Sequence, residues 1–379
     1  MEHAGNLDDF ATLSTQVTRH VADFIESQKP LLAGISADLA PLNEIVRNLL
    51  DGGKRLRPAF AYWGWRAIGG TASDSFVRAI SALEFIQAGR GPHGGRHRRQ
   101  ADVLGGGARP RARPAVDRYR DDATRRGRPS VHEQFAALHG ESGWHGSAHQ
   151  FGTGAAILLG DLCLTWADEM FYGSDLATDT LSLGKPYFDV MRTEVMAGQY
   201  LDLLEQVRQT ADIDAVRQVM IFKSAKYTIE RPLHLGASMA GANDEQLKTL
   251  THYAIPLGVA FQLRDDVLGV FGDPQTTGKP AGDDVREGKR TMLIARTLNA
   301  ATEEQRHYIG EHLGNKELTT SQLERFREII VETGALATVE NDIHRGREKA
   351  SEALAAGDFS TESKSALENL AQLATERNQ

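Results

Sequence analysis

The chain has 379 residues, of which 41% are hydrophobic and 25% carry a charge, and its net charge at pH 7 is −8. This length and apolar content suffice for one large domain or two smaller ones. The acidic balance argues against a general nucleic-acid binder, whose affinity would come from neutralising phosphates. Because Cys163 is the only cysteine, an internal disulfide and a cysteine-based metal cluster are excluded.

No segment has the pattern of a membrane span or of a signal peptide. The chain lacks a run of about eighteen apolar residues, and its start, Met1–Gly5, lacks the basic and then apolar layout of a secretory signal. We therefore expect a cytoplasmic protein without an integral membrane segment.

Helical periodicity runs through almost the whole chain and predicts an all-α protein. Near the start, apolar residues recur at the i, i+3, i+4, i+7 and i+8 positions of a helix stripe, namely Leu42, Ile45, Val46, Leu49 and Leu50. Only 12 prolines interrupt the chain, so long helices can form. We expect residues 1–379 to form a single helical domain.

A basic segment, Gly52–Pro58, follows this first stripe. Its two glycines let the backbone approach a ligand closely. Lys54 and Arg57 lie three residues apart at the start of an expected helix, so we expect them to share a face. Both side-chain types bind phosphate oxygens. Taken alone, such a segment is more often a solvated helix start, but an acidic segment further along the chain favours an anion site.

The composition changes abruptly from Gly89 to about Arg120. Glycine, arginine and proline dominate there, and the change interrupts a helical pattern that runs to Gln87. Because such a segment buries too little surface to offset its ordering entropy, we expect 89–120 to be a disordered interruption. One hypothesis is a wrong reading frame of a GC-rich gene. A genuine insertion is the alternative, because the gap from Gln87 to Arg125 is longer than a frame slip alone explains.

Three later features concern helices. The segment 151–171 is rich in alanine, leucine and glycine, so we expect a helix buried on all sides in which Asp161 needs a partner. Ser321–Glu324 predicts a capping box, and Gly334 predicts the end of that helix. The residues after Gly357 predict one last amphipathic helix.

The most informative segment is Phe261–Asp266, in which two adjacent carboxylates follow the amide Gln262. Carboxylate oxygens are hard ligands that suit Mg²⁺ together with phosphate oxygens. Asp265 and Asp266 would repel each other inside an apolar segment unless they shared a cation. We therefore predict that both bind Mg²⁺, with Lys279 and Lys289 neutralising the charge that the metal leaves.

Together these segments resemble the trans-polyprenyl diphosphate synthases over roughly residues 42–291. The matching segments are Gly52–Pro58 for the isopentenyl diphosphate site, Arg125–His132 for a twin-arginine stretch, Gly198–Asp202 for a cavity-lining helix, Lys223-Ser224 for a lysine-threonine pair and Phe261–Asp266 for the second aspartate motif. The resemblance implies an all-α bundle around a central substrate cavity, dependence on Mg²⁺ and a homodimer.

The resemblance also implies a reaction and residue roles. An allylic diphosphate would lose its diphosphate, and isopentenyl diphosphate would attack the resulting cation, giving a longer product for which we expect geranylgeranyl diphosphate. Isopentenyl diphosphate would be held by Lys54, Arg57, Gln87 and Arg126. The allylic diphosphate would face Arg125, Lys223, Ser224, Gln262, Lys279 and Lys289, and the catalytic roles would fall to Lys223, Gln262 and Asp265.

The chain departs from the family in two places. Its second aspartate motif has Gly269 where the fullest version has a third aspartate. The first motif, an Asp-Asp-x-x-Asp pattern expected on the helix that continues from Gln87, is replaced by the interruption. The nearest remnant is Asp117 and Asp121, which share a face if helical and would bind metal weakly.

These departures leave a second interpretation open, a non-catalytic subunit that keeps the fold but lacks a working first motif. An RNA-binding arm in 89–120 is disfavoured because that stretch contains no aromatic residue for stacking apart from Tyr119. A terpene cyclase is disfavoured because it would not need the Gly52–Pro58 site for a second diphosphate. For Gln199 and Asp202, a polar bridge between helices explains the pattern as well as a substrate contact does.

Overall fold

The chain folds almost entirely into helices. The structure is a computed structural model that describes residues 4–93, 124–125, 128–208, 211–273 and 281–376. Within them the strands are β1 (Thr124–Arg125) and β2 (Arg128–Pro129), which pair antiparallel. The predicted all-α class is confirmed. No described helix is both long enough and apolar enough to cross a membrane.

Among the described residues, the first half of the fold has seven helices of more than ten residues, joined by short connections wherever these are described. The helices are α1 (Ala4–Ile35), η1 (Ala37–Leu39), α2 (Ala40–Leu50), α3 (Leu56–Ala67), α4 (Asp74–His93), α5 (Val131–Glu141), α6 (Ala148–Tyr172) and α7 (Thr178–Arg208).

The second half begins with the short helix α8, which continues directly into a π-helix, η4. Its helices are α8 (Ile213–Met220), η4 (Ile221–Glu230), α9 (Arg231–Met239), α10 (Asp244–Phe271), α12 (Asp283–Glu287), α13 (Met292–Ala300), α14 (Glu303–His312), α15 (Thr320–Glu332), α16 (Ala335–Ala356) and α17 (Thr361–Thr375).

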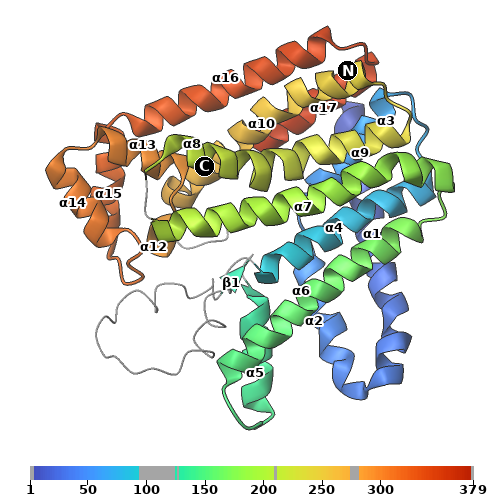
Figure 1. Cartoon of the computed structure of the whole chain (residues 1–379), viewed down its shortest axis with the longest axis horizontal. Coiled ribbons are helices and arrows are strands. Elements are labelled where there is room, and N and C mark those ends of the chain that lie inside the picture. Colours follow the sequence, from blue (N-terminus) through green and yellow to red (C-terminus); the bar gives the residue numbers. More distant parts are fainter. Residues whose placement is uncertain (1–3, 94–123, 126–127, 209–210, 274–280, 377–379) are drawn as a thin grey trace.

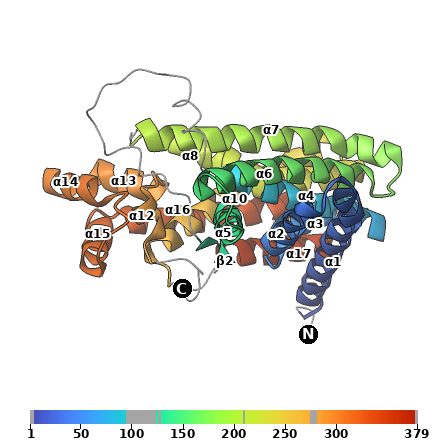
Figure 2. The ribbon, with the colours of Figure 1, turned by 90° about the horizontal axis from the view of Figure 1, so that it is seen from below.

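The long helices lie side by side in a flattened bundle (Figure 1). The most extensive packing pairs α4 with α6, α10 with α16 and α3 with α9. Viewed from below, α7 lies along one side of the bundle and α17 along the other, while α12, α14 and α15 form a group at one end (Figure 2).

Helix α10 joins two hydrophobic cores. Its first half contributes Tyr253 and Leu257 to the larger core, which involves α1 to α7, η4, α9, α16 and α17. Its second half contributes Leu263 and Val267 to a smaller core with α8 and α12–α16. The predicted acidic motif therefore lies on the half of α10 that packs against the C-terminal helices.

Several local predictions are confirmed, and one cap is shifted. Ile45, Val46 and Leu50 are buried on α2, and α17 is the expected last helix. The capping box of α15 begins at Thr319, two residues before the predicted Ser321, because Gln322 bonds back to Thr319. The threonine and the glutamine have the same three-residue spacing that the prediction placed on Ser321 and Glu324.

Two expectations about α4 and α6 are wrong. Helix α4 continues to His93, so the start of the predicted interruption is helical, while residues 94–120 lie outside the described residues. Helix α6 is not buried on all sides, because Leu158 is 69% exposed and Asp161 also faces outward. Its apolar composition reflects an exposed apolar face in addition to a buried one.

Candidate active site

The two adjacent carboxylates of α10 lie in different environments. Asp266 is 3% exposed, whereas Asp265 faces solvent. The amide of Gln262 donates to Oδ1 of Asp266 at 2.8 Å, and its carbonyl accepts from the hydroxyl of Ser224. Burial raises the pKa of Asp266 well above its usual value, and the carboxylates of Asp284 and Asp265 raise it further. A chain of hydrogen bonds thus joins η4 to the acidic motif.

Lys223 lies where α7 and η4 approach closely. A Cβ added at Gly198 would come within 2.6 Å of the backbone nitrogen of Lys223, so glycine is required for this approach. Nζ of Lys223 donates to Oδ2 of Asp202 at 2.6 Å. The interpretation of Asp202 as a polar bridge between helices is therefore confirmed, and the bridge holds the Lys223 side chain against α7.

The position of the missing third aspartate is already taken by another carboxylate. A Cβ added at Gly269 would overlap Oδ2 of Asp284, which is 6% exposed on α12. Nζ of Lys289 donates to Oδ1 of Asp284 at 2.6 Å and also contacts Glu287 at 2.5 Å. The glycine therefore has a steric reason, because a side chain there would displace Asp284.

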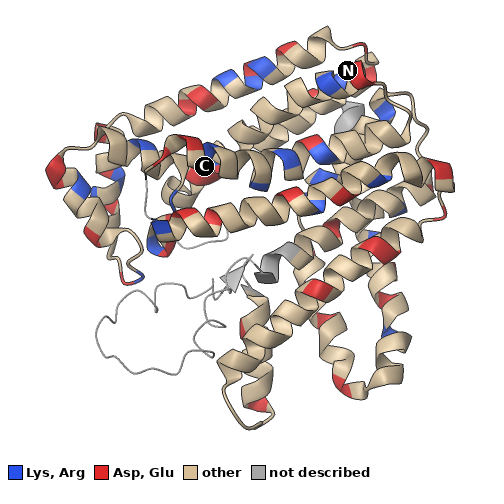
Figure 3. Cartoon of the chain, in the orientation of Figure 1, with Lys and Arg blue, Asp and Glu red and all other residues tan. Residues whose placement is uncertain are grey.

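The donor set at this end of α10 suits a hard divalent cation. Asp265 and Asp266 supply carboxylate oxygens on α10. On α12, carboxylate oxygens of Asp283, Asp284 and Glu287 lie within 4.8 Å of one another, and oxygen ligands are the ones that Mg²⁺ prefers. Among the described residues, no basic side chain forms an ion pair with Asp266. Acidic and basic positions lie next to one another around α12 and the C-terminal end of α7 (Figure 3). Neighbouring acidic and basic residues of this kind suit a metal ion carrying a diphosphate.

The basic segment has a different shape from the one predicted. Helix α3 begins at Leu56, so Lys54 is an exposed loop residue and does not share a helix face with Arg57. The reason is a left-handed turn, since φ is 72° at Gly52, 103° at Gly53 and 47° at Arg55. Such a turn cannot continue into the first helical turn.

Arg57 contacts the same π-helix that carries Lys223 and Ser224. Its guanidinium carbon lies 4.3 Å from the ring centre of Tyr227, and Nη2 donates to the hydroxyl of Thr228 at 3.3 Å. Among the described residues, Nε of Arg57 and Oε1 of Gln87 are buried and have no hydrogen-bond partner. Both atoms can therefore interact with a ligand. Helix η4 thus contacts both predicted diphosphate sites.

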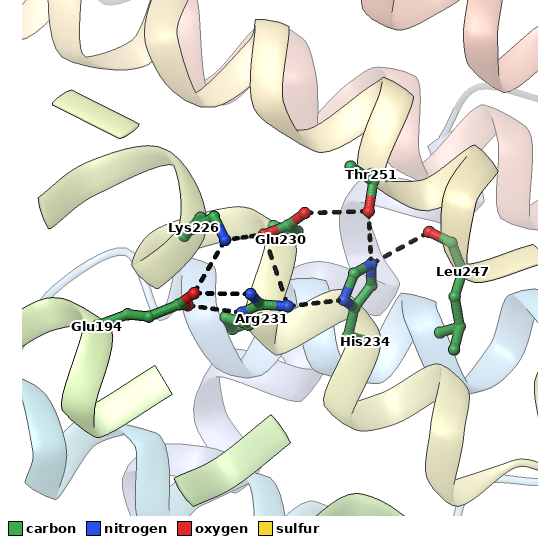
Figure 4. Close-up of polar contacts among 7 residues, drawn as sticks. All are labelled: Glu194, Lys226, Glu230, Arg231, His234, Leu247 and Thr251. Atoms are coloured by element: carbon green, nitrogen blue, oxygen red, sulfur yellow. Dashed lines mark hydrogen bonds and ion pairs between the residues drawn. The ribbon is translucent and has the colours of Figure 1, made fainter. Parts of the chain in front are cut away.

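A second polar cluster holds η4 in place (Figure 4). Glu194 of α7 accepts from Lys226 at 2.9 Å and from Nε of Arg231 at 2.7 Å. Glu230 lies between these cations and Thr251 of α10, whose hydroxyl donates to it at 3.0 Å. Lys226 and Arg231 thus both form ion pairs with Glu194, and the cluster ties η4 to α7, α9 and α10.

Some predicted site residues cannot be placed. Arg125 has a described backbone in β1, without a described side chain. The others lie outside the described residues, namely Asp117, Asp121, Arg126 and Lys279.

The sequence prediction missed several residues that complete the site. Arg55 lies inside the basic segment, and Glu84 lies three residues before Gln87, but neither was assigned. Tyr227 and Thr228 follow Lys223-Ser224 by one helical turn, so helical spacing from that pair was the available signal. Asp284 had a signal in its position five residues before Lys289, although only the folded chain brings it to Gly269.

Comparison with known proteins identifies relatives along most of the chain. The sequence matches the polyprenyl synthetase family over residues 120–330, which begins where the predicted interruption ends. Geranylgeranyl diphosphate synthase of Saccharolobus solfataricus is 30% identical over 281 residues, covering 74% of this chain and 73% of that protein. Geranylfarnesyl diphosphate synthase of Aeropyrum pernix is 29% identical, covering 86% of this chain and 87% of that protein.

A solved structure extends the likeness to the whole fold. The crystal structure of geranylgeranyl pyrophosphate synthase from Corynebacterium glutamicum, complexed with isoprenyl diphosphate and magnesium, is 35% identical with a TM-score of 0.87. The alignment covers 97% of this chain and 99% of that chain. The present chain belongs to the polyprenyl synthetase family and is a trans-prenyltransferase that elongates prenyl chains.

Proposed function

We propose that the chain condenses isopentenyl diphosphate with an allylic diphosphate and that the reaction depends on Mg²⁺. The observation that carries this proposal is the position of η4 between two polar sites. On one side Ser224 bonds to Gln262 and so reaches Asp266, and on the other side Thr228 bonds to Arg57. An enzyme that joins two diphosphate substrates needs two such sites close together.

The allylic site is assigned to the acidic end of α10 and the helices beside it. Asp265 and Asp266 would hold Mg²⁺, and Asp284 lies close enough to raise the pKa of Asp266. When bound, the metal would stabilise charge that develops on the departing diphosphate. The residues assigned to the allylic diphosphate are Lys223, Ser224, Gln262 and Lys289, together with Arg125 and Lys279. Lys223, Gln262 and Asp265 keep their predicted catalytic roles.

The isopentenyl diphosphate site is assigned to the start of α3 and the facing part of α4. Lys54 and Arg57 supply positive charge, and Gln87 lies on α4 with a buried amide oxygen. Arg126 completes the predicted set. Asp117 and Asp121 remain our proposal for a first metal site.

The product is proposed to be geranylgeranyl diphosphate. Support comes from the names of two relatives, in Saccharolobus solfataricus and Corynebacterium glutamicum, which are geranylgeranyl synthases. The Aeropyrum pernix relative has a longer named product. Product length is therefore the first property to measure.

We also propose that the chain forms a homodimer in the cytoplasm through α6 and the start of α7. Large apolar side chains are exposed there, with Leu158 at 69%, Leu183 at 51% and Tyr172 at 44%. Helix α6 has no lysine or arginine, and Figure 3 shows few charged positions on it. Exposed apolar faces of this kind favour association. Sedimentation of the wild type should give a dimer, and Leu158→Asp should give a monomer.

The test of the activity uses the purified full chain. With labelled isopentenyl diphosphate, farnesyl diphosphate and Mg²⁺, we expect a labelled product that chromatographs as geranylgeraniol after dephosphorylation. Chelation of Mg²⁺ should abolish it. Substrate binding without product would favour the alternative, a non-catalytic subunit whose first aspartate motif does not work. An independent read of the gene across codons 85–129 would show whether that motif is present.

A further inference from the structure

Arg55 is a buried arginine in an unusual backbone conformation. Its φ and ψ are 47° and 34°, in the left-handed region, and it is 3% exposed. Residues other than glycine adopt this conformation rarely. An arginine is also among the residues that are least often fully buried unless paired. The left-handed backbone and the buried charge are both unfavourable, so other contacts of Arg55 must stabilise this arrangement.

Three hydrogen bonds supply those contacts. Nη1 donates to Oε2 of Glu84 on α4 at 2.5 Å, and Nη2 donates to the carbonyl oxygen of Leu50 at 2.6 Å. Nε donates to the hydroxyl of Thr18 on α1 at 3.3 Å. The guanidinium therefore ties the basic segment to α1, α2 and α4 at once.

The residues around this ion pair are those assigned to isopentenyl diphosphate. Lys54 is adjacent to Arg55, and Arg57 follows two residues later on α3. Gln87 lies one helical turn after Glu84 on α4, so the two residues lie near one face of that helix. One ion pair thus fixes the position of the loop with Lys54 and the start of α3 with Arg57 relative to the part of α4 that carries Gln87.

We propose that Arg55 is a positioning residue for isopentenyl diphosphate. It does not touch the substrate, because its guanidinium is buried against Glu84, Leu50 and Thr18. Instead it holds Lys54 and Arg57 at the correct place relative to Gln87. This inference rests on the proposed function, since it concerns the same substrate site.

The test measures the binding of each substrate separately. Asparagine tolerates the left-handed conformation but is too short to reach Glu84, so Arg55→Asn removes the anchor with little backbone strain. Calorimetry with isopentenyl diphosphate should show at least tenfold weaker binding than the wild type. Binding of farnesyl diphosphate with Mg²⁺ should change less than threefold. Arg55→Lys, which keeps one charged contact to Glu84, should recover part of the affinity.

Arg66→Ala is the matched control, because Arg66 lies on α3, the helix that begins directly after Arg55, and pairs with the exposed Glu362 at 3.2 Å. It should bind both substrates as the wild type does. If Arg55→Asn fails to fold, the double variant Arg55→Asn, Glu84→Gln removes the unpaired buried charge and replaces it in the test.

Two results would overturn the inference. One is that Arg55→Asn binds isopentenyl diphosphate with the affinity of the wild type. The other is an equal loss of affinity for both substrates, which would indicate general damage to the fold. Failure of the proposed function is a separate result, in which the wild type binds both substrates without forming product.

Discussion

Two buried charges, Arg55 and Asp266, are each 3% exposed, but their surroundings differ. Arg55 faces a carboxylate of the same chain, Glu84, at 2.5 Å. Asp266 faces two further carboxylates, Asp284 and Asp265, and among the described residues it has no basic partner. A buried charge with an internal counter-ion stabilises structure, whereas one that faces like charges needs a ligand to neutralise it. We therefore expect substitutions at the basic end to lower the stability of the fold and substitutions at the acidic end to lower the rate of the reaction.

The largest expected effect is on stability at the basic end. Glu84→Ala would leave the guanidinium of Arg55 buried without its counter-ion, which costs about 3–5 kcal/mol of unfolding free energy. Denaturant unfolding measures this loss. Glu362→Ala is the control, because Glu362 forms an exposed ion pair with Arg66, and it should cost less than about 1 kcal/mol. Equal losses in the two variants would contradict the distinction.

At the acidic end the expected effect is on rate. Asp266→Asn keeps the shape of the side chain but removes a charge that would hold the metal, so kcat should fall about 10²–10³-fold. Its unfolding free energy without metal should not fall, since the substitution removes a buried carboxylate that faces two like charges. Asp244→Asn, at the exposed start of the same helix, should leave kcat unchanged. A destabilised Asp266→Asn with normal kcat would argue for a structural role.

A smaller effect concerns the glycine in the acidic motif. Gly269→Asp restores the family's third aspartate, but its Cβ would overlap Asp284. We expect a loss of roughly 1–3 kcal/mol in stability, the usual cost of overpacking, and no gain in kcat. Gly310→Asp serves as control because nothing lies within 4 Å of a Cβ there. Wild-type stability in Gly269→Asp would mean that Asp284 can move away freely.

The acidic end could be predicted from the sequence because its signal is local. Asp265, Asp266 and Gln262 fall within five consecutive residues of one helix, and two adjacent carboxylates in an apolar segment need a physical reason. The contact between Gly269 and Asp284 could not be predicted in this way. The two residues lie on different helices, α10 and α12, and helical periodicity does not describe how separate helices pack.

The basic end was predicted less well for the same reason. The glycines before Lys54 indicated a turn, but the left-handed Arg55 depends on Glu84, 29 residues further on. Helix α6 shows another limit, since its composition could not separate a face buried within the chain from one exposed at Leu158. Residues 89–93 show a third limit of the sequence prediction. Their glycines and proline predicted a break in the helix, but α4 continues to His93.

The smallest expected effect concerns His234, a buried histidine whose surroundings disfavour its protonated form. Burial lowers the pKa of His234, more than the carboxylate of Glu230 raises it, and Arg231 lowers it further. The unfolded chain therefore takes up a proton near pH 6.5 that the folded chain does not. Stability is fully present above pH 6.5 and is lost as the pH falls toward the lower folded pKa, by at most about 1.4 kcal/mol per pH unit.

His234 also bonds to Thr251 and to the carbonyl of Leu247. The variant His234→Gln should therefore lower Tm at every pH but flatten its decline between pH 7 and pH 5. His344→Gln, at an exposed position on α16, should leave the slope unchanged, and an equally steep slope in His234→Gln would assign the decline to other groups.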